Sequence, residues 1–137
     1  MKKEVLINLT SVQTVDSESS KTELITSGSI KPVEGGFEIT YEESEATGFE
    51  GSKTILTCIG NERASIVRKG KSYSNLIIEK DHKHHCHYGT PFGEFTVGIF
   101  AHEINNELTP NGGKLYLKYT VDINSSYISD NEIYLTI

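Results

Sequence analysis

Apolar and polar residues alternate along most of this chain with a period of two residues. The pattern is clearest near the C-terminus, where the apolar positions are Leu115, Leu117, Tyr119, Val121 and Ile123. An antiparallel strand with one face in the core and the other in water has this pattern. Residues 115–123 are therefore predicted to form a strand. No stretch of ten or more residues shows a clean helical period.

Ten such segments follow one another along the sequence, separated by turns rich in glycine and asparagine. They are residues 5–9, 24–30, 37–42, 53–59, 64–68, 72–79, 81–88, 94–103, 115–123 and 133–137. Short strands at regular spacing indicate a β-sandwich or a β-barrel. We favour an all-β fold, a closed antiparallel up-and-down barrel of eight to ten strands, because hairpins predominate and closure leaves no sheet edge exposed. A single domain, residues 1–137, is expected.

Two segments interrupt the alternation. Residues 42–51 carry four glutamates and two glycines, and are predicted to form a mobile acidic loop at one end of the barrel. Residues 104–113 are mostly polar and include Pro110, and are predicted to form a loop with a short helical turn.

Charge and cysteine content narrow the environment and the partners. The formal net charge is −6, and the two arginines, Arg63 and Arg68, form no basic patch. Nucleic acid and anionic membranes are therefore not expected as partners. No apolar segment approaches the roughly 20 residues that span a bilayer. Two cysteines, Cys58 and Cys86, suit a reducing compartment, so we expect a cytoplasmic protein, with a bridge between them as the alternative.

One stretch of sequence carries a family resemblance. His87-Tyr88-Gly89-Thr90-Pro91-Phe92-Gly93, followed by an alternating strand, resembles the signature of the YwiB-like family. Other pieces follow in the family's order, namely Tyr41-Glu42-Glu43, Arg68 two residues before Gly70, and residues 113–120. These bacterial proteins of unknown function have a lipocalin-like (calycin) barrel. The resemblance covers nearly the whole chain and implies that fold, with little about function beyond a small apolar ligand, which such barrels often hold.

The residues 90–93 also have a local explanation. Proline presets φ at the second position of a β-turn, and glycine ends the turn. Phe92 at the tip of this turn is either a structural residue or a gate over the barrel mouth.

Four histidines, His82, His84, His85 and His87, surround Cys86 before this turn. If the hairpin turns at residues 91 and 92, Tyr88 lies opposite Phe95, Cys86 opposite Val97, His84 opposite Ile99 and His82 opposite Ala101. That face is apolar on the partner strand and should point inward, with His85 and His87 outside. Imidazole and thiolate bind zinc and other transition metals, so His84 and Cys86 form a candidate metal site if another strand supplies a third ligand. The alternative is that these histidines are ordinary surface and lining residues. A lumen-facing His84 would resist protonation.

Arg68 shares the parity of Ala64 and Ile66, and we expect it to point into the barrel. A buried guanidinium needs a partner, and Glu43, in phase with Tyr41, is the candidate. Arg68 then either closes one end of the barrel or anchors a ligand carboxylate or phosphate.

The leading functional hypothesis is a barrel that binds a small, partly apolar ligand in its lumen. The predicted lining residues are Tyr41, Arg68, Tyr73, His84, Cys86, Tyr88 and Tyr119, an unusual polar set for small barrels, which aliphatic residues normally fill. No nucleophile elbow, phosphate loop or zinc-protease motif is present in the sequence. Two alternatives stay open: an enzyme that holds a metal or haem on a lumen histidine, and a regulatory or interaction protein with a filled barrel. The sequence assigns no cofactor and no oligomeric state.

Overall fold

Ten antiparallel strands build the computed structural model, which describes residues 2–43, 50–70, 73–90, 93–123 and 126–137. The strands are β1 (Lys3–Val15), β2 (Glu18–Val33), β3 (Gly36–Glu42), β4 (Lys53–Ile59), β5 (Arg63–Lys69), β6 (Ser74–Glu79), β7 (Lys83–Thr90), β8 (Gly93–Thr109), β9 (Gly112–Ile123) and β10 (Ser126–Thr136). Each pairs with the next in sequence, and β10 pairs with β1, so the barrel is closed. The predicted up-and-down barrel is confirmed.

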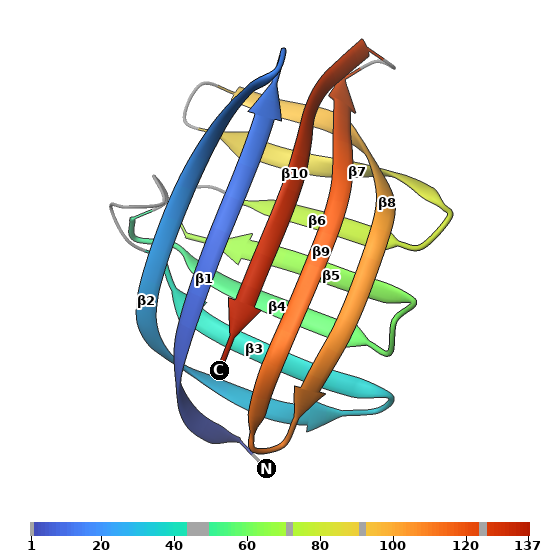
Figure 1. Ribbon diagram of the computed structural model, residues 1–137. Helices are drawn as coiled ribbons and strands as arrows, with labels where there is room; N and C mark the ends of the chain where they lie inside the picture. Colours follow the sequence, from blue (N-terminus) through green and yellow to red (C-terminus); the bar gives the residue numbers. More distant parts are fainter. Residues whose placement is uncertain (1, 44–49, 71–72, 91–92, 124–125) are drawn as a thin grey trace.

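The strands form two layers that cross at a steep angle (Figure 1). In Figure 1, β1, β8, β9 and β10 lie in front and run steeply across β3, β4, β5 and β6 behind them. No helix in the described ranges is long and apolar enough to cross a membrane. Most of the predicted acidic loop (residues 44–49) and the turn residues Pro91 and Phe92 lie outside the described part of the chain.

β8 departs most from the prediction, because residues 104–109 continue the strand instead of forming a loop. The register of β8 against β9 shifts between Ala101 and Glu103. This bulge moves the inward positions from odd to even residue numbers, so that Ile104 and Leu108 enter the core. The chain turns only after Thr109, and Gly112 then has a φ of 129°, a conformation that favours glycine.

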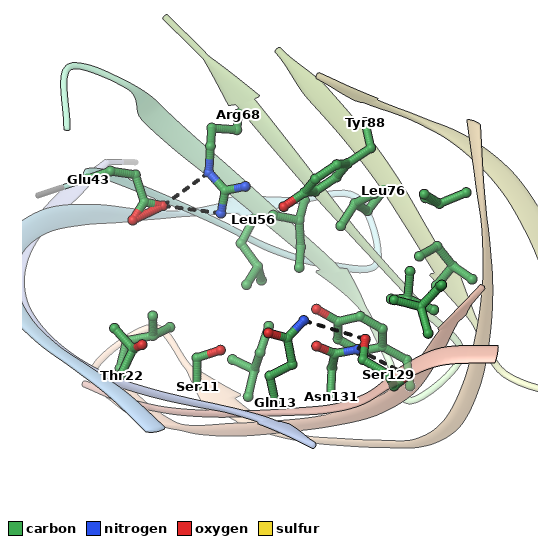
Figure 2. Close-up of a pocket in the computed structure, with 18 of the residues that line it drawn as sticks. Ser11, Gln13, Thr22, Glu43, Leu56, Arg68, Leu76, Tyr88, Ser129 and Asn131 are labelled. Carbon is green, nitrogen blue, oxygen red and sulfur yellow. Dashed lines mark hydrogen bonds and ion pairs between the residues drawn. The ribbon is translucent and has the colours of Figure 1, made fainter. Parts of the chain in front are cut away.

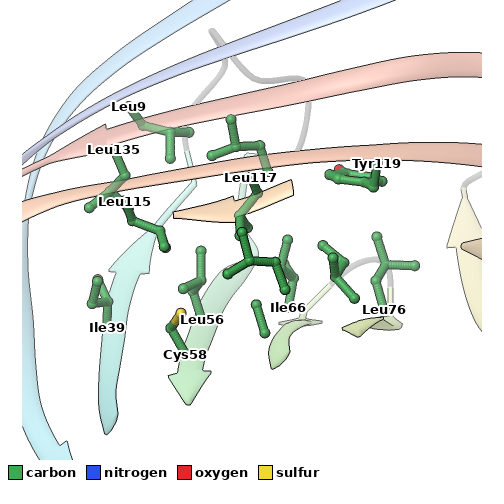
Figure 3. Close-up of a cluster of buried hydrophobic side chains, with 14 of the residues drawn as sticks. Leu9, Ile39, Leu56, Cys58, Ile66, Leu76, Leu115, Leu117, Tyr119 and Leu135 are labelled. Carbon is green, nitrogen blue, oxygen red and sulfur yellow. The ribbon is translucent and has the colours of Figure 1, made fainter. Parts of the chain in front are cut away.

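Aliphatic side chains fill one part of the barrel in rows that run across the strands. One row crosses β3 to β6 through Ile39, Leu56, Ile66 and Leu76. The facing row crosses β2, β1, β10 and β9 through Leu24, Leu9, Leu135 and Leu115. All eight side chains are buried. Figure 3 shows the two rows facing each other, with Leu9, Leu115 and Leu135 on one side and Ile39, Leu56 and Ile66 on the other. Burial of these apolar side chains is the main stabilisation of the barrel.

Candidate functional site

A cavity of about 490 Å³ lies beside this core inside the barrel. Its floor is apolar and consists mainly of Leu9, Leu56, Ile66, Leu76, Ile99 and Ile133. Two groups of polar side chains, called here the two polar walls, face each other across the cavity, as Figure 2 shows. Eight-stranded barrels are about wide enough for their own side chains, and diameter grows with strand number, so ten strands leave room for a cavity.

The first wall is one row of inward residues on β3 to β7. Tyr41 pairs with Thr54, Thr54 with Arg68, Arg68 with Ser74, and Ser74 with Tyr88. This row lies two residues along each strand from the aliphatic row, so the register itself gathers the polar groups into one layer. The buried hydroxyl of Ser74 has no hydrogen-bond partner among the described residues.

Glu43 joins this wall and pairs with Arg68, as the sequence predicted. The backbone N–H of Glu43 donates to the carbonyl of Ser52, which extends the β3–β4 ladder and keeps Glu43 in phase with Tyr41. Its Oε2 lies 3.4 Å from both Nε and Nη2 of Arg68, and accepts a hydrogen bond of 2.5 Å from the Thr54 hydroxyl. The Glu43 side chain is 2% exposed and that of Arg68 is 14% exposed. The arginine therefore has a buried counter-charge.

The second wall carries neutral polar groups on β1, β2 and β10. Ser20 pairs with Gln13, and Gln13 pairs with Asn131. The side-chain amides of Gln13 and Asn131 both donate to the Ser129 hydroxyl, at 3.5 and 2.9 Å. Figure 2 places these groups opposite Glu43 and Arg68.

Sequence reasoning missed this second wall, whose lining residues are Ser11, Gln13, Ser20, Thr22, Ser129 and Asn131. A signal was present, because each of these residues is in phase with the inward aliphatic residues of its own strand. Ser11 and Gln13, for example, follow Ile7 and Leu9 at steps of two.

Tyr119 on β9 pairs with Asn131 and extends the second wall by one strand. Burial raises the pKa of Tyr119 to about 12, and the nearby positive charge of Arg68 opposes that rise. Burial also raises the pKa of Tyr41, and the charge of Glu43 adds to the effect. Both phenols therefore keep their protons at neutral pH and are able to donate a hydrogen bond.

Four of the seven residues predicted to line the lumen line this cavity: Tyr41, Arg68, Tyr88 and Tyr119. Tyr73, predicted with them, lies outside, with 46% of its surface exposed and its ring 5.7 Å from that of His87. The reason is parity, since the inward positions of β6 are the even ones that begin at Ser74.

Cys86 points inward and is buried, but it belongs to the seam between β6 and β7 rather than to the cavity. Its Sγ accepts a hydrogen bond of 3.3 Å from the backbone N–H of Ile77. Both cysteines are free, and the alternative of a bridge between Cys58 and Cys86 is wrong.

His84 lies opposite Ile99, in the predicted register, but its ring leaves the lumen. Nε2 lies 2.7 Å from Glu79 Oε1, and the side chain is 30% exposed. The expectation that His84 faces the lumen is therefore wrong. His82 also departs from the prediction, because Lys80 bridges to Ala101 in its place. Within the described ranges, no three His, Cys, Asp or Glu side chains are grouped closely enough to hold a metal ion.

The barrel has a counterpart among solved structures. The crystal structure of the ywiB protein from Bacillus subtilis superposes with a TM-score of 0.77, at 18% sequence identity, over 98% of this chain and 92% of that one. At this identity the likeness shows a common fold. No curated protein matches the chain.

A family model described as "Domain of unknown function (DUF1934)" matches residues 7–135. The match extends from β1 into β10 and so includes both walls of the cavity. It agrees with the resemblance seen in the residues around Tyr88 and Gly93. The chain belongs to the DUF1934 family.

Proposed function

We propose that this protein binds a small, partly apolar molecule in the cavity of its barrel, in the manner of lipocalin-like (calycin) proteins. The observation that supports this most is the cavity itself, a space of about 490 Å³ inside the barrel with an apolar floor and two polar walls. Pockets for small molecules have such volumes and combine apolar lining with a few placed polar groups.

The other two functions that the sequence left open have less support. An enzyme with a metal or haem on a lumen histidine needs a histidine in the cavity, and the candidate, His84, contacts Glu79 instead. A protein that acts only through its surface was expected to have a barrel filled by side chains. The cavity of about 490 Å³ speaks against such a filled barrel.

A cytoplasmic location is part of the same proposal. Cys58 and Cys86 are buried and free, and free thiols are usual in reducing compartments.

The experiment is a fluorescence titration with the uncharged dye N-phenyl-1-naphthylamine, which brightens in apolar sites. Ser11 lines the cavity, so Ser11→Phe should place a bulky ring inside it and obstruct it, whereas Thr10→Phe places the same ring on the outer face of β1. We expect saturable binding by the wild type and Thr10→Phe, and its loss in Ser11→Phe. Absence of binding by the wild type, or equal binding by all three proteins, would overturn the proposal.

A further inference from the structure

We infer that the molecule bound in this cavity is an uncharged amphiphile with a hydrogen-bonding head, such as a hydroxyl or amide, and an aliphatic or aromatic body. This inference rests on the proposed function and names the class of ligand for the same site. The charges, the polar groups and the apolar residues of the lining all favour this class.

The lining has a balanced charge. Glu43 and Arg68 are the two charged side chains among the described residues that line the cavity. They lie 3.4 Å apart and nearly out of water, so each already holds its counter-charge. A formal charge on the ligand would therefore lose its hydration in the cavity without gaining a net opposite charge there.

An anion is disfavoured in particular. A ligand carboxylate close enough to reach the Arg68 guanidinium would also lie near the Glu43 carboxylate, and like charges in a poorly hydrated site repel strongly. The net charge of −6 on the whole chain adds to this repulsion. A cation has the opposite difficulty, because it meets Arg68 wherever it approaches Glu43.

A neutral polar head finds partners on both walls. On the first wall, the three contacts that Thr54 and Arg68 make to the Glu43 carboxylate are all to Oε2, and none of them uses Oε1. The Oε1 atom can therefore accept a hydrogen bond from the head of the ligand. On the other wall, the side chains of Ser11, Gln13 and Asn131 offer both donors and acceptors. Hydroxyl and amide groups are matched to such a mixture, since they too donate and accept.

The body of the ligand would lie on the apolar floor. Leu56, Ile66 and Leu76 provide it on one side, and Ile133 on the other. Polar walls above an apolar floor orient an amphiphile, with the head between the walls and the body toward the core.

The test is displacement of bound N-phenyl-1-naphthylamine by three molecules of equal chain length, 1-octanol, octanoate and octylamine, at neutral pH. We expect octanol to displace the dye from the wild type at a concentration lower by about tenfold or more than either charged molecule, as desolvated like charges imply. An octanoate or octylamine that competes as well as octanol would overturn the inference.

Two variants test whether the preference for octanol comes from the balanced charges of Glu43 and Arg68 or from a general preference of the cavity for uncharged molecules. Glu43→Gln leaves Arg68 without its counter-charge and should shift the ratio of octanoate to octanol affinity about tenfold toward octanoate. Arg68→Gln should shift the ratio of octylamine to octanol affinity toward octylamine in the same way. Ratios unchanged from the wild type in variants that fold would also overturn it. If a variant fails to fold, the ranking in the wild type decides.

Failure of this inference and failure of the proposed function give different results. A wild type that binds the dye but prefers octanoate refutes the ligand class and leaves the binding function in place. A wild type that does not bind the dye refutes the binding function itself.

Discussion

The Glu43 carboxylate and the Arg68 guanidinium meet inside the barrel although 25 residues separate them in sequence. The β3–β4 and β4–β5 registers bring them together, since Thr54 on β4 pairs with both Tyr41 and Arg68 and donates its hydroxyl to Glu43. Three strands thus fix one buried ion pair at the cavity wall.

Breaking this pair should destabilise the protein. We expect Glu43→Gln and Arg68→Met each to reduce the free energy of unfolding by about 2–3 kcal/mol, because each leaves a buried polar partner unmatched. The double variant should lose less than the sum by about 1 kcal/mol or more. Urea unfolding of all four proteins measures this coupling, and simple additivity would show that the two side chains do not interact.

The number of strands and the closure of the barrel were predictable because period-two alternation is a local property of the sequence. The ends of several strands were not. Residues 5–9 were predicted for the first strand, which runs from Lys3 to Val15, because its inward positions turn polar at Ser11 and Gln13. The loss of the hydrophobic pattern coincides with the cavity wall, so the feature that hid these strand ends is the candidate site itself.

The candidate site was predictable in part for the same reason. Parity placed Tyr41, Arg68, Tyr88 and Tyr119 in the lumen, and all four line the cavity. Parity could not show that the His84 side chain turns toward Glu79. That contact depends on a residue of the neighbouring strand, β6, and not on the pattern within β7. Strict alternation also missed the bulge in β8, which changes the inward positions from odd to even between Ala101 and Ile104.

Stability at high pH should depend on Tyr119. Its folded pKa of about 12 lies above the ordinary value of 10.0, so the unfolded chain releases this proton first as the pH rises. The contribution is fully present below about pH 10 and is lost as the pH rises toward 12. We expect Tyr119→Phe to unfold with a smaller alkaline loss than the wild type in urea titrations. Tyr73→Phe, at an exposed position, is the control and should follow the wild type; the reverse pattern would contradict the burial of Tyr119.

Stability at low pH should depend on the contact between His84 and Glu79. The hydrogen bond from His84 holds the pKa of Glu79 below its ordinary value of 4.5. Stability from this pair is therefore present above about pH 4.5 and is lost as the pH falls through the lowered value. His84→Phe should flatten that acid loss, whereas His85→Ser, on the exposed outer face, should not. Equal acid slopes for His84→Phe and the wild type would show that the contact is not formed in solution.

The two thiols should be unreactive in the folded protein. Burial raises the pKa of Cys58 to about 11 and also raises that of Cys86, so little thiolate exists at neutral pH. We expect iodoacetamide to label neither cysteine in native protein and both in urea, as read by intact mass. Rapid labelling of Cys86 in native buffer would mean that the β6–β7 seam opens readily.

The claim that the cavity binds a ligand is tested most directly by native mass spectrometry of protein purified from a bacterial host. We expect the wild type and Thr10→Phe to carry a non-covalent adduct that disappears on denaturation. Ser11→Phe, with its cavity obstructed by the ring, should show the bare mass of the chain. The account is contradicted if the wild type gives only the bare mass, or if Ser11→Phe retains the same adduct.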